Sequence, residues 1–139
     1  GTYTIPLKAM VCSVGTSATP TPAGTFTTGV RQVKKELMGP SWGQYSTHIC
    51  WGIYFHSVSS GDCKNYKTTV PVGSYYMLGQ PASHGCVRLL VADAKWIYDN
   101  IPKGTIVEIG DNMPMPLGKP SVPKMVVAGV DPTDPNPYG

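Results

Sequence analysis

The chain has 139 residues, enough for one domain with a single core, and 41% of them are hydrophobic while only 14% are charged. The net charge is +3, and the chain has no block of five or more like charges, so nucleic-acid binding has little support. It also has no run of 18 apolar residues, so no membrane contact is predicted. Because the chain begins at Gly1 without methionine, we expect a processed or excised piece from which any signal peptide or anchor has been removed.

The first half of the chain has the pattern of short strands separated by turns, as the 16 glycines and 14 prolines suggest. A first strand is predicted around Met10 and Val11, and TPTPAGTF predicts a turn. TFTTGVRQV is predicted as a second strand and KKELMGPSWG as a loop. QYSTHICWGIYFHS is the longest β-type segment, and we expect a break near Gly52 that makes it a hairpin.

The second half combines a long irregular segment, one helix and a last strand. Residues 57–83 are rich in glycine and proline, and loops of that length are usually functional or disordered. Apolar residues recur at helical spacing after Cys86 and predict a helix from Val91 to Asn100, followed by a strand in TIVEIG. Seven prolines lie between Pro114 and Pro137. We therefore assign residues 1–112 to one domain and 113–139 to a Pro-rich extension that packs on it or trails from it.

The cysteines suggest one nucleophile rather than a metal site. None of the four belongs to a Cys-x-x-Cys pair, so no metal or other cofactor is expected, and Cys12 is interpreted as a small buried apolar residue. Cys86 lies in PASHGCVRLL, just after Gly85 and ahead of the predicted helix. Free N–H groups at such a junction lower the pKa of a thiol and stabilise an oxyanion. Cys86 is therefore predicted to be a thiolate nucleophile.

A nucleophilic thiol needs a base, and the chain has three histidines. His56 is the preferred candidate because it ends an apolar strand and opens the long loop. His84 is either the base or a residue that shapes the turn, and His48 is interpreted as a strand residue. No Cys-His-Asp triad is indicated, so we expect a backbone carbonyl or Ser57 to orient the base.

SHGCVRL resembles the signature of the L,D-transpeptidase catalytic domain, the YkuD-type family, in which an upstream histidine is the base. MVCSVGTSATPTPAGTFTT, FHS and DAKWIYDNIPKGTIVEI resemble further segments of that domain, so the resemblance covers Tyr3 to Ile109. It implies a mainly β fold, a mixed β-sheet sandwich with one main helix after Cys86. The sequence departs from the family pattern in two features. His56 lies 30 positions before Cys86, which is further than is common in the family, and Arg88 stands where many members have Asn.

The resemblance implies a cysteine-dependent acyltransferase, a peptidoglycan L,D-transpeptidase. Cys86 would attack the carbonyl of the third residue of a tetrapeptide stem and release D-Ala, and an acceptor amine would take the thioester to form a 3→3 cross-link. His56 would take and return protons, and the N–H groups of Gly85 and Cys86 would hold the oxyanion. Ser57 would orient the imidazole.

The remaining candidate site residues have roles in binding or in shaping the site. Ser83 and His84 would shape it. Arg88 either clamps a substrate carboxylate or orders the site loop through a salt bridge, and the sequence does not separate these readings. Tyr75 and Tyr76, from the long loop, would form one wall of the cleft, unless they simply pack the insertion.

Other functions and settings follow from the same residues. An L,D-carboxypeptidase would give the acyl-enzyme to water, and a catalytically inactive wall-binding module is the second alternative, against which the presence of both His56 and Cys86 argues. A general cysteine protease is a further class, but the residues around Cys86 do not resemble those around the catalytic cysteine of papain or of caspases. The expected partners are peptidoglycan stem peptides and, as covalent inhibitors, carbapenems. The expected place is outside the cytoplasmic membrane, at the cell wall, in wall biogenesis and the maintenance of cell shape.

Cys50 and Cys63 flank the candidate base at six and seven residues. If the chain turns back at His56, the two thiols would come within the reach of a disulfide, which an extracytoplasmic setting permits. The alternatives are that both stay reduced or that Cys12 takes one of them.

Overall fold

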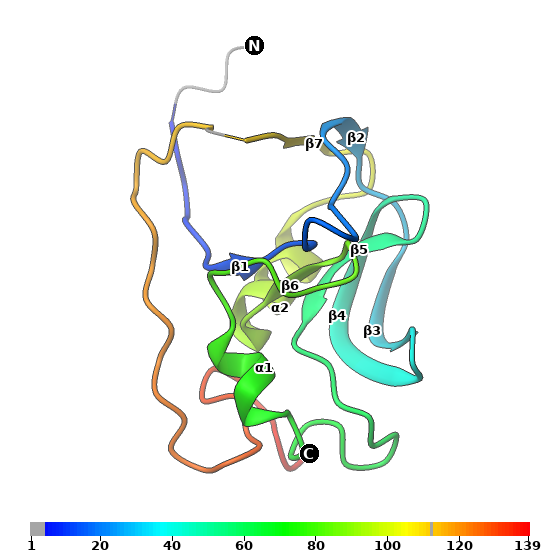
Figure 1. Cartoon of the computed structure of the whole chain (residues 1–139), viewed down its shortest axis with the longest axis vertical. Coiled ribbons are helices and arrows are strands. Elements are labelled where there is room, and N and C mark those ends of the chain that lie inside the picture. The colour runs from blue at the N-terminus through cyan, green and yellow to red at the C-terminus, as the bar shows by residue number, and fades with distance from the viewer. Residues whose placement is uncertain (1–4, 112) are drawn as a thin grey trace.

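The computed structural model describes residues 5–111 and 113–139, which form two β-sheets and two helices (Figure 1). In sheet order, the larger sheet consists of β1 (Cys12–Ser13), β6 (Val87–Leu89), β5 (Ile53–Ser57), β4 (Ser41–Cys50) and β3 (Arg31–Leu37). The smaller sheet pairs β2 (Gly24–Thr27) with β7 (Ile106–Ile109), and the helices are α1 (Val72–Tyr76) and α2 (Val91–Asn100). The protein is mainly β, as predicted.

The larger sheet is mixed because β5 and β6 run parallel while their other neighbours pair antiparallel. The register places Phe55 beside Val87 and His56 beside Arg88. Parallel strands need a long crossover, and here the chain between β5 and β6 contains α1. This pairing brings the segment around His56 next to the segment around Cys86.

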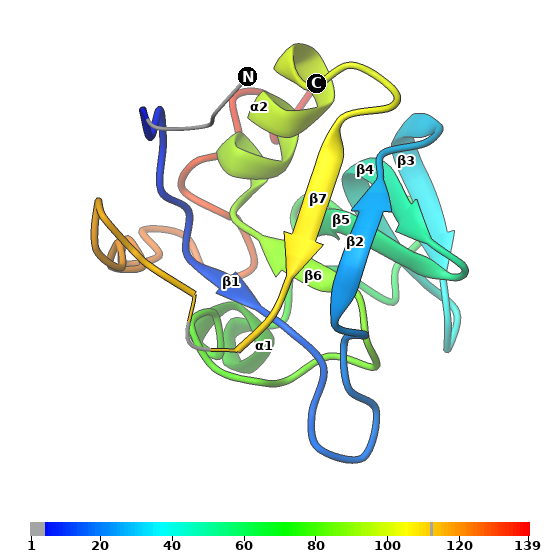
Figure 2. The ribbon, with the colours of Figure 1, turned by 90° about the horizontal axis from the view of Figure 1, so that it is seen from above.

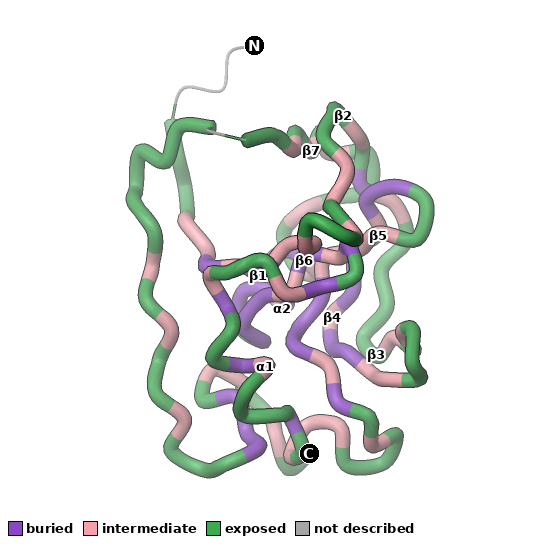
Figure 3. Tube along the Cα trace, viewed as in Figure 1, coloured by how far each residue is buried: buried purple, intermediate pink, exposed green. Residues whose placement is uncertain are grey.

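The main core lies between the larger sheet, α2 and the smaller sheet. Figure 2 shows β2 and β7 in front of β5 and β6, with α2 near the upper end of β7. The buried residues of this cluster come from β4, β6 and α2, and side chains of β2 and β7 pack against them. A second cluster joins α1 to the long loop and to Val122 and Met125 of the C-terminal segment. Figure 3 shows the buried residues concentrated along β4, β6 and α2.

The C-terminal segment, residues 113–139, packs on the domain and caps its main helix. Leu90, the residue before α2, supplies no side-chain cap. Instead, the carboxylate of Asp131 accepts a hydrogen bond of 2.9 Å from the Val91 N–H, and Asp131 is only 2% exposed. Asp134 accepts a second hydrogen bond, also 2.9 Å, from the Gln44 side chain. Residue 112, where the predicted boundary between domain and extension falls, lies outside the described residues.

Several predicted elements have the predicted bounds. α2 spans Val91–Asn100, and the hairpin of β4 and β5 turns at residues 51–52, next to the expected break. The prediction of one strand in TFTTGVRQV is wrong, because residues 28–30 separate β2 from β3 and the two strands join different sheets.

The predicted loop in KKELMGPSWG is also wrong. β3 continues to Leu37, and β4 already begins at Ser41, so the loop is only the hairpin turn, where Gly39 has a φ of 106°. Pairing with β4 overrides the low β propensity of lysine and glutamate, and lysines are common on edge strands such as β3. The first strand is shorter than expected and lies at Cys12–Ser13 rather than around Met10 and Val11, and residues 1–4 lie outside the described part.

Candidate active site

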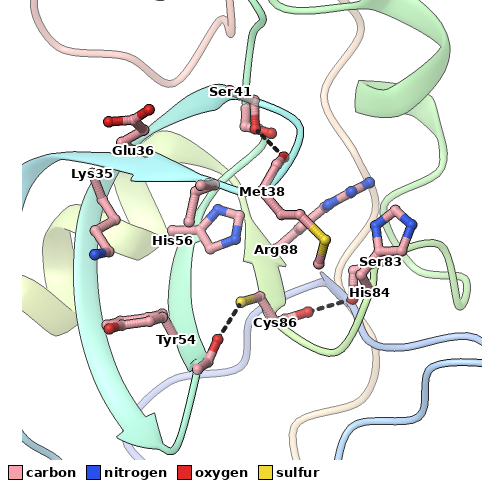
Figure 4. A pocket seen from close by; sticks show the side chains of 13 residues that line it. Lys35, Glu36, Met38, Ser41, Tyr54, His56, Ser83, His84, Cys86 and Arg88 are labelled. Carbon is pink, nitrogen blue, oxygen red and sulfur yellow. Dashed lines mark hydrogen bonds between the residues drawn. The ribbon is translucent and has the colours of Figure 1, made fainter.

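A cleft opens beside Cys86, between the β3–β4 hairpin and the loop before β6 (Figure 4). Its cavity has a volume of about 230 Å³. We call it the Cys86 cleft, and the residues that line it are Lys35, Glu36, Leu37, Met38, Ser41, Gly52, Tyr54, His56, Ser59, Ser83, His84, Cys86 and Arg88.

The alternation of side chains along β5 and β6 gathers the polar residues of this cleft. Successive side chains of a strand point to opposite faces. Tyr54 and His56 therefore share a face of β5, and Cys86 and Arg88 share the same face at β6. Val87, between the last two, is buried in the main core. The parallel register thus places the imidazole, the thiol and the guanidinium on one surface.

His56 is a buried imidazole held by the backbone. Its side chain is 3% exposed, and its Nδ1 lies 2.5 Å from the carbonyl oxygen of Ser57. Since a carbonyl only accepts, Nδ1 carries the proton and Nε2 keeps its lone pair. Burial lowers the pKa of His56 to about 4, with the Ser57 hydrogen bond opposing this shift and the positive charge of Arg88 adding to it.

The thiol of Cys86 is also neutral at rest. Its Sγ lies 3.5 Å from the carbonyl oxygen of Gly52, to which it donates. Burial raises the pKa of the Cys86 thiol, although a backbone hydrogen bond from Tyr54 and the charges of Arg88 and Lys35 oppose this. The sequence-based expectation of a lowered thiol pKa is therefore wrong, because desolvation outweighs the nearby donors and cations.

The turn before Cys86 is fixed by Ser83. The Ser83 hydroxyl donates to the Cys86 carbonyl at 2.5 Å and accepts the Gly85 N–H at 3.1 Å. Gly85 has a φ of 125°, and a Cβ there would lie 2.7 Å from the Cδ1 of Ile53, so only glycine fits. Because its N–H is already bonded within the turn, Gly85 does not provide the free oxyanion donor that the sequence predicted.

Ser57 orients His56 through its backbone rather than its side chain. The Ser57 carbonyl accepts from the imidazole, whereas its hydroxyl accepts the Gln44 N–H at 2.8 Å. Of the two alternatives that the sequence left open, a backbone carbonyl is the one observed. His84 is exposed and lines the cleft, while His48 lies outside it, within 2.6 Å of the Trp51 carbonyl oxygen.

Tyr75 and Tyr76 do not form a wall of the cleft, and this prediction is wrong. Tyr75 is fully buried in the second core cluster, and its hydroxyl donates to the carbonyl of Pro123. The hydroxyl of Tyr76 accepts the Met125 N–H at 2.9 Å. Both tyrosines therefore bind the C-terminal segment, and α1 contributes no residue to the lining of the Cys86 cleft.

The wall of the cleft that the β3–β4 hairpin supplies was not predicted from the sequence. Lys35, Met38 and Ser41 line the cleft from this hairpin, at positions that the sequence predicted as a loop. Their place depends on long-range pairing with β4, and the local sequence carries no signal for it. Gly43 of β4 lies beneath the imidazole, since a Cβ there would approach His56 Nδ1 to 3.1 Å.

The four cysteines are free thiols, so the structure does not contain the Cys50–Cys63 disulfide. The carbonyl of Cys63 accepts from Lys34, which pairs with Gln44 six residues before Cys50 on β4. The six residues from Gln44 to Cys50 span about 20 Å along β4. Cys63, which lies at the Lys34 side chain near Gln44, is therefore too far from Cys50 for a disulfide. Within residues 5–111 and 113–139, no group of three His, Cys, Asp or Glu side chains is placed to hold a metal ion.

Comparison with known proteins defines the family. The sequence model of the L,D-transpeptidase catalytic domain, YkuD, matches residues 2–109. The chain therefore belongs to the L,D-transpeptidase catalytic-domain family. It is 50% identical over 69 residues to "Putative L,D-transpeptidase YciB" of Bacillus subtilis (strain 168), which covers 49% of this chain and 32% of the relative. It is 26% identical over 118 residues to L,D-transpeptidase 2 of Mycobacterium tuberculosis, covering 74% and 26%.

The fold is shared with solved structures of the same family. An L,D-transpeptidase from Mycobacterium smegmatis matches with a TM-score of 0.61 and 24% identity, over 75% of this chain and 49% of that one. L,D-transpeptidase 3 from Mycobacterium tuberculosis matches with a TM-score of 0.53 and 24% identity, over 71% and 43%. The matched region spans about a third or less of the two curated relatives.

In the part of the chain that the structure describes, no helix is long and apolar enough to cross a membrane.

Proposed function

We propose that this chain is a peptidoglycan L,D-transpeptidase that uses Cys86 as its nucleophile. The observation that supports this most directly is the joint placement of a half-buried thiol and a buried neutral imidazole in one cleft (Figure 4). A histidine with a free Nε2 is a competent general base, and a cysteine is the strongest nucleophile among the lining side chains. Membership of the family supports the choice of stem peptides as the substrate class.

In the first half-reaction, Sγ of Cys86 attacks the carbonyl carbon of the third stem residue while its proton passes to Nε2 of His56. Because burial makes the thiol a weaker acid and the imidazole a weaker base, a free ion pair is unfavourable, and the proton moves as the C–S bond forms. The intermediate collapses, His56 gives the proton to the departing amine of D-Ala, and a thioester remains.

In the second half-reaction, an amine on a second stem attacks the thioester carbonyl. Its proton passes to His56 and then to the Cys86 sulfur as the C–S bond breaks, so the product is an amide and the free thiol returns. Since Gly85 is bonded within its turn, oxyanion stabilisation falls to the Cys86 N–H and to the positive charge of Arg88. Arg88 has no carboxylate partner among the described residues, which favours a substrate-binding role over a salt bridge.

Two extensions of the proposal concern inhibitors and location. Solved relatives include an L,D-transpeptidase in complex with imipenem and L,D-transpeptidase 3 of Mycobacterium tuberculosis with a faropenem-derived adduct. We propose that carbapenems acylate Cys86 in this chain, because their strained carbonyl presents the same electrophile to the thiol. We also propose that the enzyme works outside the cytoplasmic membrane, at the wall, where its substrate lies.

Mass spectrometry of the protein with a tetrapeptide stem tests the proposal. We expect a thioester on the Cys86 peptide, release of D-Ala, and a cross-linked product when an acceptor stem is added. Cys86→Ala should retain the fold and lose all three signals, whereas Cys63→Ser should keep them. Release of D-Ala by folded Cys86→Ala would refute the proposal. Hydrolysis that an acceptor does not suppress would favour the L,D-carboxypeptidase alternative.

A further inference from the structure

The Cys86 cleft carries two cationic side chains that have no acidic partner. Lys35 and Arg88 both line it, and neither forms a salt bridge among residues 5–111 and 113–139. The carboxylate of Glu36, on the same hairpin, points away from the thiol (Figure 4). The surface that faces a substrate is therefore positive on balance, and it is complementary to a donor that carries negative charge.

Lys35 is held at the cleft rather than free in solvent. Its Nζ lies 5.0 Å from the ring centroid of Tyr54, another residue of the cleft wall. Its neighbours along β3, Lys34 and Glu36, are exposed, whereas Lys35 is half-buried. The aromatic ring attracts the ammonium but accepts no conventional hydrogen bond from it, so its three N–H donors remain available to an anion.

The two cations lie on opposite sides of the reacting pair. Figure 4 shows Lys35 on one side of His56 and Cys86 and Arg88 on the other. Arg88 lies two residues after Cys86 on β6, where it pairs with His56 of β5, whereas Lys35 lies on β3, which β4 separates from β5. Arg88 is thus the cation nearer to Cys86 along the sheet, and Lys35 is the more remote one across the cleft.

We propose that Lys35 is a specificity-determining residue that binds a carboxylate on the side chain of the donor's third residue. This inference rests on the proposed function. The terminal carboxylate of D-Ala is one residue from the scissile carbonyl and suits the nearer Arg88, while a side-chain carboxylate reaches the remote Lys35. The preferred donor is then a stem whose third residue is a diamino dicarboxylic acid with a free carboxylate, rather than its carboxamide or a plain diamine such as lysine.

Acyl-enzyme formation without acceptor tests this directly. Three tetrapeptide donors that differ only at the third residue would be compared by the rate of thioester formation at Cys86: the free carboxylate, its carboxamide and lysine. For the wild-type protein we expect a preference of about tenfold for the free carboxylate. This ratio corresponds to the lower end of the free energies known for charge-assisted hydrogen bonds, as is expected at a partly exposed site. Lys35→Gln should bring the ratio close to one, and Lys35→Arg should restore most of it.

Lys34→Gln is the matched control, because its Nζ is bound to the Cys63 carbonyl at 2.8 Å and lies 4.7 Å from the Tyr66 ring centroid, outside the cleft. It should keep the wild-type preference. A preference that persists in Lys35→Gln, or a Lys35→Gln variant slowed equally on all three donors, would overturn the inference. Equal rates for the three donors in the wild type would also overturn it while leaving the proposed function intact. Absence of thioester with every donor, in folded protein, would overturn both.

Discussion

At the scale of single residues, His56 is an imidazole whose burial favours its neutral form. Its pKa of about 4 lies below the ordinary value of 6.5, chiefly through burial. The unfolded chain therefore binds a proton between pH 6.5 and 4 that the folded chain does not. The stabilising contribution is fully present above pH 6.5 and is lost as the pH falls toward 4.

We expect the free energy of unfolding to fall with a slope approaching 1.4 kcal/mol per pH unit in that window, about 3 kcal/mol in all, from this residue. Denaturant unfolding at closely spaced pH values measures the slope for the wild type, His56→Gln and the exposed control His84→Gln. The slope should shrink in His56→Gln and persist in His84→Gln. Identical slopes for the wild type and His56→Gln would contradict a buried neutral imidazole.

Cys86 leads to a second prediction, about reactivity. Burial raises the pKa of its thiol above the ordinary value of 9.0, so the thiolate is scarce at neutral pH in the absence of substrate. Alkylation of the Cys86 peptide by iodoacetamide should therefore be slow at pH 7 and still be rising at pH 9, as followed by mass spectrometry. A rate that is already constant between pH 5 and 8 would instead indicate a preformed thiolate–imidazolium pair.

The residues of the site differ in how far the sequence predicted them. Cys86 and His56 stand out because a Ser-His-Gly-Cys run and a strand-end histidine are local patterns, and the structure brings them into one cleft. The thiol pKa could not be predicted locally, since it depends on burial. Lys35 could not be assigned at all, because its position at the cleft arises from a strand pairing.

At the scale of elements, β4 supports the imidazole of His56 from below. Gly43 faces the hydrogen bond between His56 and Ser57: a Cβ would lie 3.1 Å from His56 Nδ1 and 3.3 Å from the Ser57 carbonyl oxygen. The absence of a side chain at this position lets the imidazole lie against the strand. The strand thus positions the imidazole by leaving space for it.

Gly43→Ala should shift the imidazole by a few tenths of an ångström and slow thioester formation by about threefold to tenfold, since a misplacement of about 1 Å already costs roughly a hundredfold. Stopped-flow or quenched acylation with the tetrapeptide donor measures this. Gly61→Ala is the matched control, because a Cβ there meets nothing within 4 Å. Equal acylation rates for the two variants would show that the imidazole tolerates the methyl group.

The elements also show where local pattern was sufficient. α2 was predictable because apolar residues recur at helical spacing and Pro102 ends the segment, and the β4–β5 hairpin was predictable from its β-branched and aromatic content. β3 was not, since Lys34 to Leu37 has no strand preference of its own and forms a strand through its partner. α1 has five residues, too few for a periodic signal.

At the scale of the whole molecule, the C-terminal segment connects regions far apart in sequence. Asp131 caps α2 at Val91, Asp134 holds Gln44 of β4, and Val122 and Met125 pack on the second core cluster. Its proline content distinguishes this segment in the sequence, but that content does not indicate that a helix cap comes from 40 residues away.

Asp131→Ala should lower the free energy of unfolding by about 1–2 kcal/mol, because it leaves the first N–H of α2 without its acceptor. Asp131→Asn, which retains a carbonyl oxygen, should recover part of the loss, and the exposed Asp111→Ala should change stability little. Urea unfolding at neutral pH measures all three. Wild-type stability in Asp131→Ala would show that the cap contributes nothing to the domain.

The parallel pairing of β5 with β6 also bears on how the Cys86 cleft forms during folding. His56 and Cys86 are 30 positions apart and meet only when a non-local strand pair closes, after the β3–β4 and β4–β5 hairpins can already have formed from local contacts. Contacts of high sequence separation form late, because the entropy of loop closure must be overcome first. We therefore expect the thiol to stay apart from the imidazole during refolding until the chain is nearly native, so that the proposed chemistry is absent from the partly folded states.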